Sequence, residues 1–550
     1  MTDDRVLDPS DPYARNAQTF PVLSPGMIER MTRFGNVESV EDGSFLFRRG
    51  ERSVDFFVVL DGAVDIFDED RGRERRVHRH EASQFTGELD LFNDRKILVS
   101  GRFEGPGRVL RVPRRSFRAM VAAEPDIAEL IMRAFILRRV GLLQHEQGGV
   151  TLVGSQRSAD TVRLNAFLTR NGYPHRIIDT DSDTDAASFL DYFKLAANDL
   201  PVVIADGTAL RNPRNLDLAE ALGLTIDVDP SHVFDVAVVG AGPSGLAAAV
   251  YAASEGLDTV VLEGIAPGGQ AGTSSKIENY LGFPTGISGQ ALAGRAQVQA
   301  QKFGAKLAVA RAVDRIECET ADFRLMLEDG ASIRARAVIA ASGARYRRIE
   351  VDGLARFEGA GVHYAATAME AKLCAGAPVV VVGGGNSAGQ AALFLSRHAA
   401  HVYVLVRGGG LAATMSRYLI ERIEAAETVS LHPWCEISAL GGDTSLEWVA
   451  WRERDRTEPV QVPAQALFVM IGAIPNSQWL DGCADLDAKG FVITGTDGGS
   501  PFATSRPGLF AVGDLRAGSV KRVASGVGEG SVVIQFVHRW LEQREGVAST

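Results

Sequence analysis

The chain has 550 residues, of which 45% are hydrophobic and 23% charged, and its net charge is −11. This length accommodates three or four domains, and the composition is that of an ordinary globular protein. The acidic balance argues against nucleic acid or an anionic membrane surface as the main partner. No apolar run reaches the roughly 18 residues of a membrane-spanning helix, and the polar N-terminus does not resemble a secretory signal, so we expect a cytoplasmic protein.

The four cysteines are spread widely: Cys318, Cys374, Cys435 and Cys483. No C-x-x-C pair and no zinc-ligand spacing occurs in the sequence. Scattered cysteines in a cytoplasmic protein are most often buried and inert. We therefore expect these four to be inert, and we expect no metal site.

Short runs of β-forming residues extend from residue 24 to residue 112. The stretch FFVVLDGAVDIF predicts a hairpin that turns at Asp61-Gly62, and GRVLRVP predicts another strand. RRSFRAMVAAEPDIAELIMRAFILRRVGLL then predicts helices broken near Glu124-Pro125. A small β-roll followed by helices is the fold expected for residues 1–147.

Strands and helices alternate through the next region, residues 148–228. VTLVG, HRIIDTD and LPVVIADG predict strands, whereas SADTVRLNAFLTRNGY, AASFLDYFKLAA and NLDLAEALGL predict helices. This order predicts a compact α/β unit.

A glycine-rich turn follows the strand FDVAVV and opens a helix, with Gly240, Gly242 and Gly245 in the pattern G-x-G-x-x-G. Glu263 closes the next strand. The glycines permit a tight turn and close approach of the backbone to a pyrophosphate, which the free N–H groups of the helix N-terminus can bind. The carboxylate can bind ribose hydroxyls, so the whole pattern predicts a dinucleotide site.

A second turn, with Gly383, Gly385 and Ala388, follows a four-valine strand and precedes the helix SAGQAALFLS. The next strand, HVYVLV, ends at Arg407 rather than at an acid. A guanidinium suits a ribose 2′-phosphate, and Arg417 offers a second contact, so we expect NADPH rather than NADH. The alternative is that Arg407 is only a solvated strand end.

Residues from about 233 to 541 resemble the low-molecular-weight thioredoxin reductase family. APGGQAGTSSKIENYLGFP resembles the loop that cradles the flavin in that family, and AVGDLRAGSVKRVASGVGEG resembles its closing flavin motif. The resemblance implies an FAD-binding domain in two parts, 233–349 and 471–550, interrupted by an NAD(P)H-binding domain at 350–470. It also implies a homodimer.

The turns and the resemblance together assign two sets of cofactor residues. For FAD they are Gly240, Gly242, Pro243, Ser244, Gly245, Glu263, Gly269, Gln270, Asn279, Gly513, Asp514, Lys521, Arg522 and Val523. For NADPH they are Gly383, Gly385, Asn386, Ser387, Ala388, Arg407 and Arg417. The alternative for Asp514 is a loop-end acid that caps the following turn.

Thioredoxin reductases carry a C-x-x-C pair just before the second turn, followed by an acid. In this chain Ala365 and Ala368 occupy the two cysteine positions, and Met369 stands in place of the acid. Alanine supplies no thiolate, and Cys374 alone cannot hold two electrons as an internal disulfide. The sequence therefore assigns no catalytic residue.

The two N-terminal regions also resemble known families. Residues 148–228 resemble a glutaredoxin-like thioredoxin fold in which Pro201 is the cis-proline and Ser158 to Thr161 replace C-P-Y-C, so a spacer or docking role is favoured over catalysis. Residues of about 20 to 145 resemble a cyclic-nucleotide-binding domain, with Gly87 near the cyclic phosphate and Glu88 on the ribose. The arginine that neutralises the phosphate is replaced in NDRKILVSGR, so a sensor for another ligand or a structural cap are alternatives.

The predicted fold is therefore multidomain α/β: a β-roll with helices, a thioredoxin-like unit and two Rossmann-like domains. The predicted function is that of an FAD-dependent NADPH oxidoreductase that passes electrons to a non-dithiol acceptor, a small molecule or a redox protein, under regulation by the N-terminal domain. One alternative is a sensor or scaffold that binds the nucleotides but barely turns over. Another is disulfide reduction through an external thiol partner docked near Ala365 and Ala368.

Overall fold

The computed structural model describes residues 11–548 apart from 53, 71–72, 88, 93–94, 184–185, 187–189, 192, 194, 206, 275–276, 278–279, 319–321, 359, 365, 367, 413 and 497–498. The chain divides into two compact units, and each is described by itself. The first consists of Met1–Gly154, Leu164–Asp227 and Lys306–Ala310. The second consists of Ser155–Arg163, Val228–Ala305 and Arg311–Thr550.

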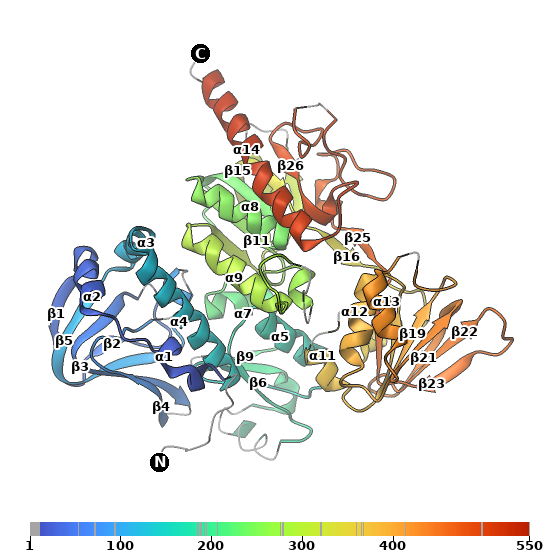
Figure 1. Cartoon of the computed structure of the whole chain (residues 1–550), viewed down its shortest axis with the longest axis horizontal. Helices are drawn as coiled ribbons and strands as arrows, with labels where there is room; N and C mark the ends of the chain where they lie inside the picture. Colours follow the sequence, from blue (N-terminus) through green and yellow to red (C-terminus); the bar gives the residue numbers. More distant parts are fainter. Residues whose placement is uncertain are drawn as a thin grey trace. The chain divides into compact units, whose positions relative to one another are not determined.

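The N-terminal region, drawn in blue in Figure 1, is built on a five-stranded antiparallel sheet in the order β1-β5-β3-β4, with β2 paired to β5. Two helices follow the sheet and break at Glu124-Pro125, as predicted. The elements are α1 (Asn16–Thr19), α2 (Pro25–Met31), β1 (Asn36–Val40), β2 (Phe45–Phe47), β3 (Phe56–Asp70), β4 (Arg73–His80), β5 (Ser100–Val112), α3 (Arg114–Ala123) and α4 (Pro125–Gln144).

The hairpin predicted at Asp61-Gly62 is wrong, because β3 is one strand that pairs with β5 from Phe56 to Phe67, on both sides of that dipeptide. The register shifts on both sides of Asp61, and Gly62 has a φ of +87°. A methyl group on Gly62 would lie 2.6 Å from the ring of Phe103. The glycine therefore makes a β-bulge in a continuous strand rather than a chain reversal.

The middle region forms a four-stranded sheet in the order β7-β6-β8-β9. β6 and β7 are parallel, whereas β8 is antiparallel to both of its neighbours. The peptide bond before Pro201 is cis, as predicted. Within the helix predicted near residues 186–197, positions 187–189, 192 and 194 lie outside the described residues. The elements are β6 (Val150–Val153), α5 (Ala159–Arg170), β7 (His175–Ile178), β8 (Val202–Ala205), β9 (Thr208–Arg211) and α7 (Asn215–Leu222).

The first nucleotide-type sheet has seven strands, in the order β12-β11-β10-β15-β14-β13, with β26 paired to β15. β10, β11, β15 and β26 are parallel, and β13, β14 and β15 form an antiparallel meander. The elements are β10 (Val233–Val239), α8 (Pro243–Ser254), β11 (Thr259–Glu263), α9 (Gly289–Lys302), β12 (Lys306–Val309), β13 (Val313–Glu317), β14 (Phe323–Leu327), β15 (Ser332–Ala340), β26 (Leu509–Ala511) and α14 (Val523–Ala548).

The second nucleotide-type sheet is parallel, in the order β17-β24-β18-β19-β20, and a three-stranded antiparallel sheet, β21-β22-β23, follows it. The two connections to the first sheet, β16 (Ala344–Tyr346) and β25 (Ala473–Pro475), pair with each other. The remaining elements are α10 (Leu354–Phe357), β17 (Val362–His363), α11 (Ala368–Leu373), β18 (Pro378–Val382), α12 (Asn386–Leu395), β19 (His401–Val406), α13 (Arg417–Glu424), β20 (Val429–Pro433), β21 (Cys435–Gly441), β22 (Trp448–Glu453), β23 (Val460–Pro463) and β24 (Ala466–Val469).

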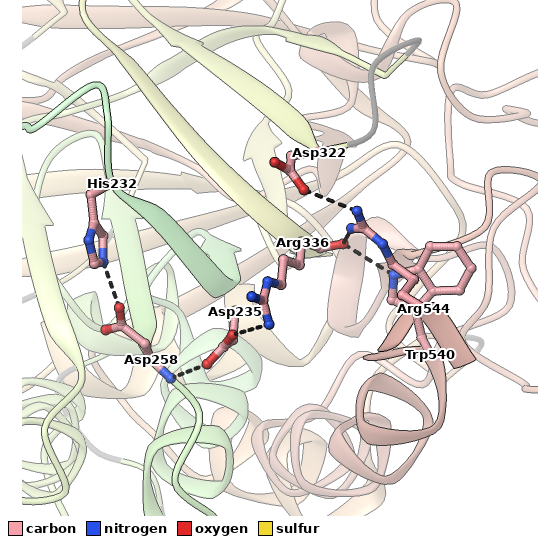
Figure 2. Close-up of polar contacts among 7 residues, drawn as sticks. All are labelled: His232, Asp235, Asp258, Asp322, Arg336, Trp540 and Arg544. Atoms are coloured by element: carbon pink, nitrogen blue, oxygen red, sulfur yellow. Dashed lines mark hydrogen bonds and ion pairs between the residues drawn. The ribbon is translucent and has the colours of Figure 1, made fainter. Parts of the chain in front are cut away.

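The C-terminal helix α14 packs beside α8 and is fastened to β15 by polar contacts (Figure 2). The carbonyl of Arg336 accepts hydrogen bonds from Trp540 Nε1 and Arg544 Nη1, each at 3.1 Å. Arg544 Nη2 also donates to Asp322 at 3.1 Å. On its other side, the Arg336 guanidinium donates to Asp235 at 3.3 Å, which links β15 to β10.

The fold class predicted from the sequence is confirmed: the chain is multidomain α/β, with a β-rich N-terminal domain and two Rossmann-like sheets. Within the described ranges, every helix is too short or too polar to traverse a lipid bilayer.

Candidate functional site

The first glycine turn joins β10 to α8 and depends on the absence of side chains. Gly240 has a φ of +103°, and a methyl group there would collide with the carbonyl oxygen of Ala341. A methyl group on Gly245 would collide with the carbonyl oxygen of Gly240. Gly242, the N-cap of α8, faces open space instead, with no heavy atom nearer than 4.0 Å to where its Cβ would stand. The turn thus leaves a clear approach to the helix N-terminus, which fits a pyrophosphate.

Glu263 ends β11 beside this turn and holds it in shape. Its carboxylate accepts hydrogen bonds from the backbone N–H of Ala241 at 2.9 Å, of Ile265 at 3.0 Å and of Ala266 at 3.3 Å. A carboxylate offers about four acceptor positions, so one remains for a hydroxyl group.

The loop after β11 folds back over the turn. The N–H of Gly268 donates to the carbonyl of Ala241 at 2.7 Å, and a methyl group on Gly269 would lie 3.0 Å from the Cα of Gly242. Gln270 donates from Nε2 to the carbonyl of Ala344. The structure therefore brings Gly269 and Gln270 to the first turn, whereas Asn279 lies outside the described residues.

The closing motif meets the same turn from the far end of the sequence. Methyl groups on Gly513 and Gly526 would each collide with Ser244 Oγ, and one on Gly530 would collide with the Ser244 carbonyl. These three glycines let the start of α8 lie directly against the closing motif and α14. Pro243 and Ser244 are the first residues of α8.

Asp514 lies in this junction and is half-buried. Burial raises the pKa of its carboxyl group, and the charge of Lys521 opposes that rise. Among the described residues, no hydrogen bond reaches the Asp514 carboxylate, so nothing supports the alternative that it caps the following turn. A half-buried carboxylate with free acceptor positions suits a polyhydroxylated chain such as the ribityl group of FAD.

Glu529 is a residue that the sequence analysis missed. From α14 its carboxylate accepts hydrogen bonds from the Gly513 N–H at 2.6 Å and from Ser519 Oγ at 3.1 Å, and it pairs with Arg516 at 2.7 Å. It thereby fixes the loop that carries Asp514. The only signal in the sequence was a single acid within the glycine-rich run GVGEG.

Lys521, Arg522 and Val523 lead into α14. Lys521 is exposed and places its Nζ 4.5 Å from the ring centre of Phe491. Arg522 is exposed too, and Val523 is the first residue of the helix.

The second glycine turn repeats the geometry of the first one between β18 and α12. Gly383 has a φ of +140°, and a methyl group there would collide with the carbonyl of Met470. Gly385 is the N-cap of α12 and has no heavy atom within 4 Å of its Cβ position. Ala388 is buried, while Ser387 is exposed.

The segment after β19 closes over this second turn. Asn386 accepts a hydrogen bond from the Ser416 N–H at 2.7 Å, and Thr414 donates to the Gly384 carbonyl at 2.7 Å. Arg417 follows directly, is 92% exposed and pairs with Glu421 at 2.9 Å.

The ends of β19 and β20 form an edge that the sequence analysis only partly found. Arg407 is exposed there, and among the described residues it has no ion-pair partner. Trp434 is 45% exposed, and its backbone N–H donates to the Gly408 carbonyl at 3.1 Å. A methyl group on Gly409 would lie 2.9 Å from the Trp434 ring. The guanidinium of Arg454 stands 4.8 Å from the centre of that ring. The edge, Arg407–Trp434–Arg454, thus combines a partly exposed tryptophan with two arginines, of which Arg454 lies against the ring and Arg407 follows the end of the neighbouring strand β19.

Two of the four cysteines behave as expected. Cys374 and Cys435 are buried, and burial raises the pKa of each thiol to about 11. The expectation is wrong for Cys318 and Cys483, which form a disulfide. Of the two positions that the resemblance assigns to a dithiol, Ala365 lies outside the described residues and Ala368 begins α11.

The predicted cyclic-nucleotide site is only partly described, because Glu88 lies outside the described residues. Gly87 has a φ of +106°, and a methyl group there would lie 2.6 Å from Leu91 and 3.1 Å from Phe135. Its carbonyl accepts a hydrogen bond from Arg138 Nη1 of α4 at 2.9 Å. This stretch therefore packs tightly on α4.

The profile of the pyridine nucleotide-disulphide oxidoreductase family matches residues 234–530, and that of the cyclic nucleotide-binding domain matches residues 37–124. A thioredoxin reductase of Mycoplasmopsis pulmonis is 33% identical over 55% of this chain and 95% of its own length. An NADH dehydrogenase of Bacillus subtilis is 33% identical over 54% of this chain and 57% of its own.

Among solved structures, a thioredoxin reductase of Lactococcus lactis matches 56% of this chain and 99% of its own, with 26% identity and a TM-score of 0.53. The glycine turns, the closing motif and these matches agree. The chain therefore belongs to the thioredoxin reductase-like pyridine nucleotide-disulphide oxidoreductases, which use FAD and NADPH, and it carries a cyclic nucleotide-binding domain ahead of that part.

Proposed function

We propose that this protein is an FAD-dependent NADPH oxidoreductase that passes electrons to an acceptor other than its own dithiol. The observation that carries the proposal is a pair of glycine-rich turns, both in the second compact unit, that leave the N-termini of α8 and α12 open. It is combined with alanine at Ala365 and Ala368, the two positions that the resemblance assigns to a dithiol. Bound FAD supplies the redox chemistry, since it accepts a hydride from NADPH and passes the electrons on.

The residues of the first turn bind and orient that group. Gly240, Gly242 and Gly245 leave the α8 N-terminus open to the pyrophosphate, and Glu263 takes a ribose hydroxyl. Asp514, fixed by Glu529 through the Gly513 N–H, accepts from the ribityl hydroxyls. Gly269 and Gln270 close the loop over the turn.

The second turn holds NADPH, and the Arg407–Trp434–Arg454 edge favours it over NADH. The pyrophosphate lies at Gly385 and the α12 N-terminus, and an arginine at the strand end suits the 2′-phosphate better than an acid would. Arg417 is exposed near this turn and provides a further cation.

A non-dithiol acceptor has support beyond the missing cysteines. A relative from Bacillus subtilis that is 33% identical over 54% of this chain is named an NADH dehydrogenase, so a protein named for a different reaction is similar to the flavin and nucleotide part of this chain. The acceptor here is a small oxidant or a redox protein that reaches the flavin from outside. We further propose a cytoplasmic homodimer in which the N-terminal domain, by binding a cyclic nucleotide or a related ligand near Gly87, regulates turnover.

Rapid mixing of the purified protein with NADPH or NADH tests the proposal. We expect loss of the flavin absorbance within catalytic times, faster with NADPH, followed by recovery when a quinone or ferricyanide is added. A flavin that stays oxidised would instead identify a nucleotide-binding sensor. NADPH consumption that depends on added thioredoxin would show that an external thiol protein is the acceptor. Repeating the measurement with cyclic AMP and cyclic GMP tests the regulation.

A further inference from the structure

The disulfide between Cys318 and Cys483 has no place in the proposed reaction. Cys318 directly follows β13, and Cys483 lies three residues beyond a short 3₁₀ turn, Gln478–Leu480. The two Cα atoms are 6.2 Å apart, although 165 positions separate the residues in the sequence. That interval contains the whole second nucleotide-type sheet and both connections to it, β16 and β25.

The Cys483 end of this bond is tied to the first turn through a chain of hydrogen bonds. Asn476 Nδ2 donates to the Ser342 carbonyl at 2.9 Å, and Ser342 Oγ donates to the Asn476 carbonyl at 2.7 Å. Trp479 Nε1 donates to Ser342 Oγ at 3.2 Å. Ser342 borders the turn, because a methyl group on Gly240 would lie 2.8 Å from its Cα.

The residues between Trp479 and Cys483 transmit this restraint. Trp479 is 6% exposed and Leu480 is fully buried, so the segment from Asn476 to Cys483 is packed into the domain rather than hanging from it. A bond from Cys483 to β13 therefore limits how far the backbone under Gly240 can move.

The pair is also chemically distinct from the other cysteines. Cys374 is 1% exposed and Cys435 is 2% exposed, and burial raises the pKa of both thiols to about 11, so neither is a ready nucleophile at neutral pH. Cys318 is partly exposed, whereas Cys483 is buried, so we expect a reductant to attack at Cys318. Disulfides of a reducing compartment are usually transient or redox-sensing, and the function proposed above includes a cytoplasmic location.

We propose that Cys318 and Cys483 form a reversible thiol–disulfide site that sets how tightly the first turn holds FAD. A dithiol reductant attacks the Cys318 sulfur, the S–S bond breaks, and the reductant closes to its own disulfide. Two electrons and two protons pass to the two cysteine sulfurs, which leaves both as thiols. The freed segment then loosens Ser342 and the turn, so FAD leaves faster. This inference rests on the flavin site proposed above.

The redox state is tested by alkylating the folded, FAD-loaded full-length protein with iodoacetamide, before and after treatment with dithiothreitol, and identifying the labelled peptides by mass spectrometry. We expect the Cys318 and Cys483 peptides to be labelled only after reduction, and the Cys374 and Cys435 peptides only after denaturation. Labelling of Cys318 and Cys483 without reductant would overturn the proposal. So would their resistance to dithiothreitol in the folded protein.

The coupling to FAD is tested by the rate of flavin release, followed by fluorescence without any nicotinamide nucleotide. We expect release to be at least threefold faster after reduction in the unmodified protein and in a Cys374→Ala control. In Cys318→Ala/Cys483→Ala, release is expected to be fast and indifferent to dithiothreitol. An equal rate in oxidised and reduced protein, with both thiols shown to be free, would refute the coupling. A protein that never binds FAD would refute the proposed function instead, and the alkylation result would still stand or fall independently.

Discussion

At the scale of single residues, the site depends on glycines, which have no side chain, as much as on the charged residues beside them. Gly240 and Gly245 have no room for a methyl group, whereas Gly242 has room that the protein itself does not use. Asp514 is the complement of this open space: a carboxylate in a half-buried setting with no protein hydrogen bond among the described residues. Bound FAD would account for both features, because its pyrophosphate would fill the space at Gly242 and its hydroxyl groups would donate hydrogen bonds to Asp514.

Replacing Asp514 by Asn has opposite effects on the free and the loaded protein. The folded-state pKa of Asp514 is raised by burial, so its ionised form destabilises the cofactor-free fold at neutral pH, and that cost disappears once the pH falls below the ordinary value of about 3.9. We expect cofactor-free Asp514→Asn to melt above the unmodified protein at pH 7, but to bind FAD about tenfold more weakly, because a charged acceptor is lost. Thermal melts at pH 7 and pH 3 and FAD titration measure both effects.

An exposed carboxyl provides the control for that variant. Asp481→Asn, in a surface position, should change neither the melting temperature nor the FAD affinity. A lower melting temperature for cofactor-free Asp514→Asn would contradict this account of the carboxyl.

Variants of the Arg407–Trp434–Arg454 edge should distinguish the contribution of the adenine ring to nucleotide binding from that of the 2′-phosphate. Trp434→Ala removes a stacking surface and should raise KM about tenfold for both NADPH and NADH. Arg454→Met should raise KM for NADPH about tenfold and leave KM for NADH unchanged, because only NADPH carries the phosphate. We expect kcat to stay constant in both variants, because the proposed contacts are to the adenosine end of the nucleotide and not to the nicotinamide.

Arg456→Met, two positions from Arg454 and paired with Glu453 at 3.3 Å, is the matched control and should leave both KM values unchanged. If Arg454→Met weakens NADH as much as NADPH, Arg454 does not select between the two nucleotides.

At the scale of elements, α14 has two tasks. Its first turns carry Gly526, Glu529 and Gly530 against the α8 start and the closing motif. Its last turns carry Trp540 and Arg544, which hold the helix to the Arg336 carbonyl of β15 (Figure 2). The C-terminal end of α14 therefore anchors the helix to β15, and its N-terminal end forms part of the proposed flavin site.

Weakening the contacts at the C-terminal end of α14 should change how tightly FAD is bound. Arg544→Ala removes hydrogen bonds to Arg336 and Asp322, at a cost of about 1–3 kcal/mol to the free energy of unfolding. We expect faster hydrogen exchange along α14 and faster FAD release. Arg539→Ala, exposed on the same helix, should do neither, and equal exchange in the two variants would rule out this anchoring role.

The elements also show what a sequence can reveal. Each strand–turn–helix unit was predictable, because Gly240 to Gly245 and Gly383 to Ala388 carry their signal within a few positions. The bulge at Gly62 was misread as a hairpin, because the ring of Phe103, on another strand, decides it. Trp434 was missed for the same reason, since its meaning depends on β19 and β20 ending side by side.

At the scale of the whole molecule, the chain leaves one sheet, builds a second and returns through paired connections, β16 and β25. The Cys318–Cys483 disulfide links the two sides of the same inserted segment a second time, outside the β16–β25 pair. No local pattern announced that bond, because its partners are 165 positions apart and each appeared solitary in the sequence.

Removing the disulfide should therefore lower stability as well as alter flavin release. Cys318→Ala/Cys483→Ala is expected to lose about 2–4 kcal/mol, as closing a long loop constrains the unfolded chain. Differential scanning calorimetry under oxidising conditions measures the loss. Adding dithiothreitol should shift the unmodified protein by the same amount and leave the double variant unmoved, whereas equal shifts in both would assign the effect elsewhere.

The convergence of Gly513, Gly526 and Gly530 on Ser244 has a consequence for biosynthesis. The first turn leaves the ribosome before the residues that pack against it, because the closing motif and α14 lie much later in the chain. The second nucleotide-type sheet is contiguous in the sequence and can fold before the first sheet is complete. We therefore expect FAD to bind only after α14 has been synthesised, and nascent chains truncated before α14 should be colourless.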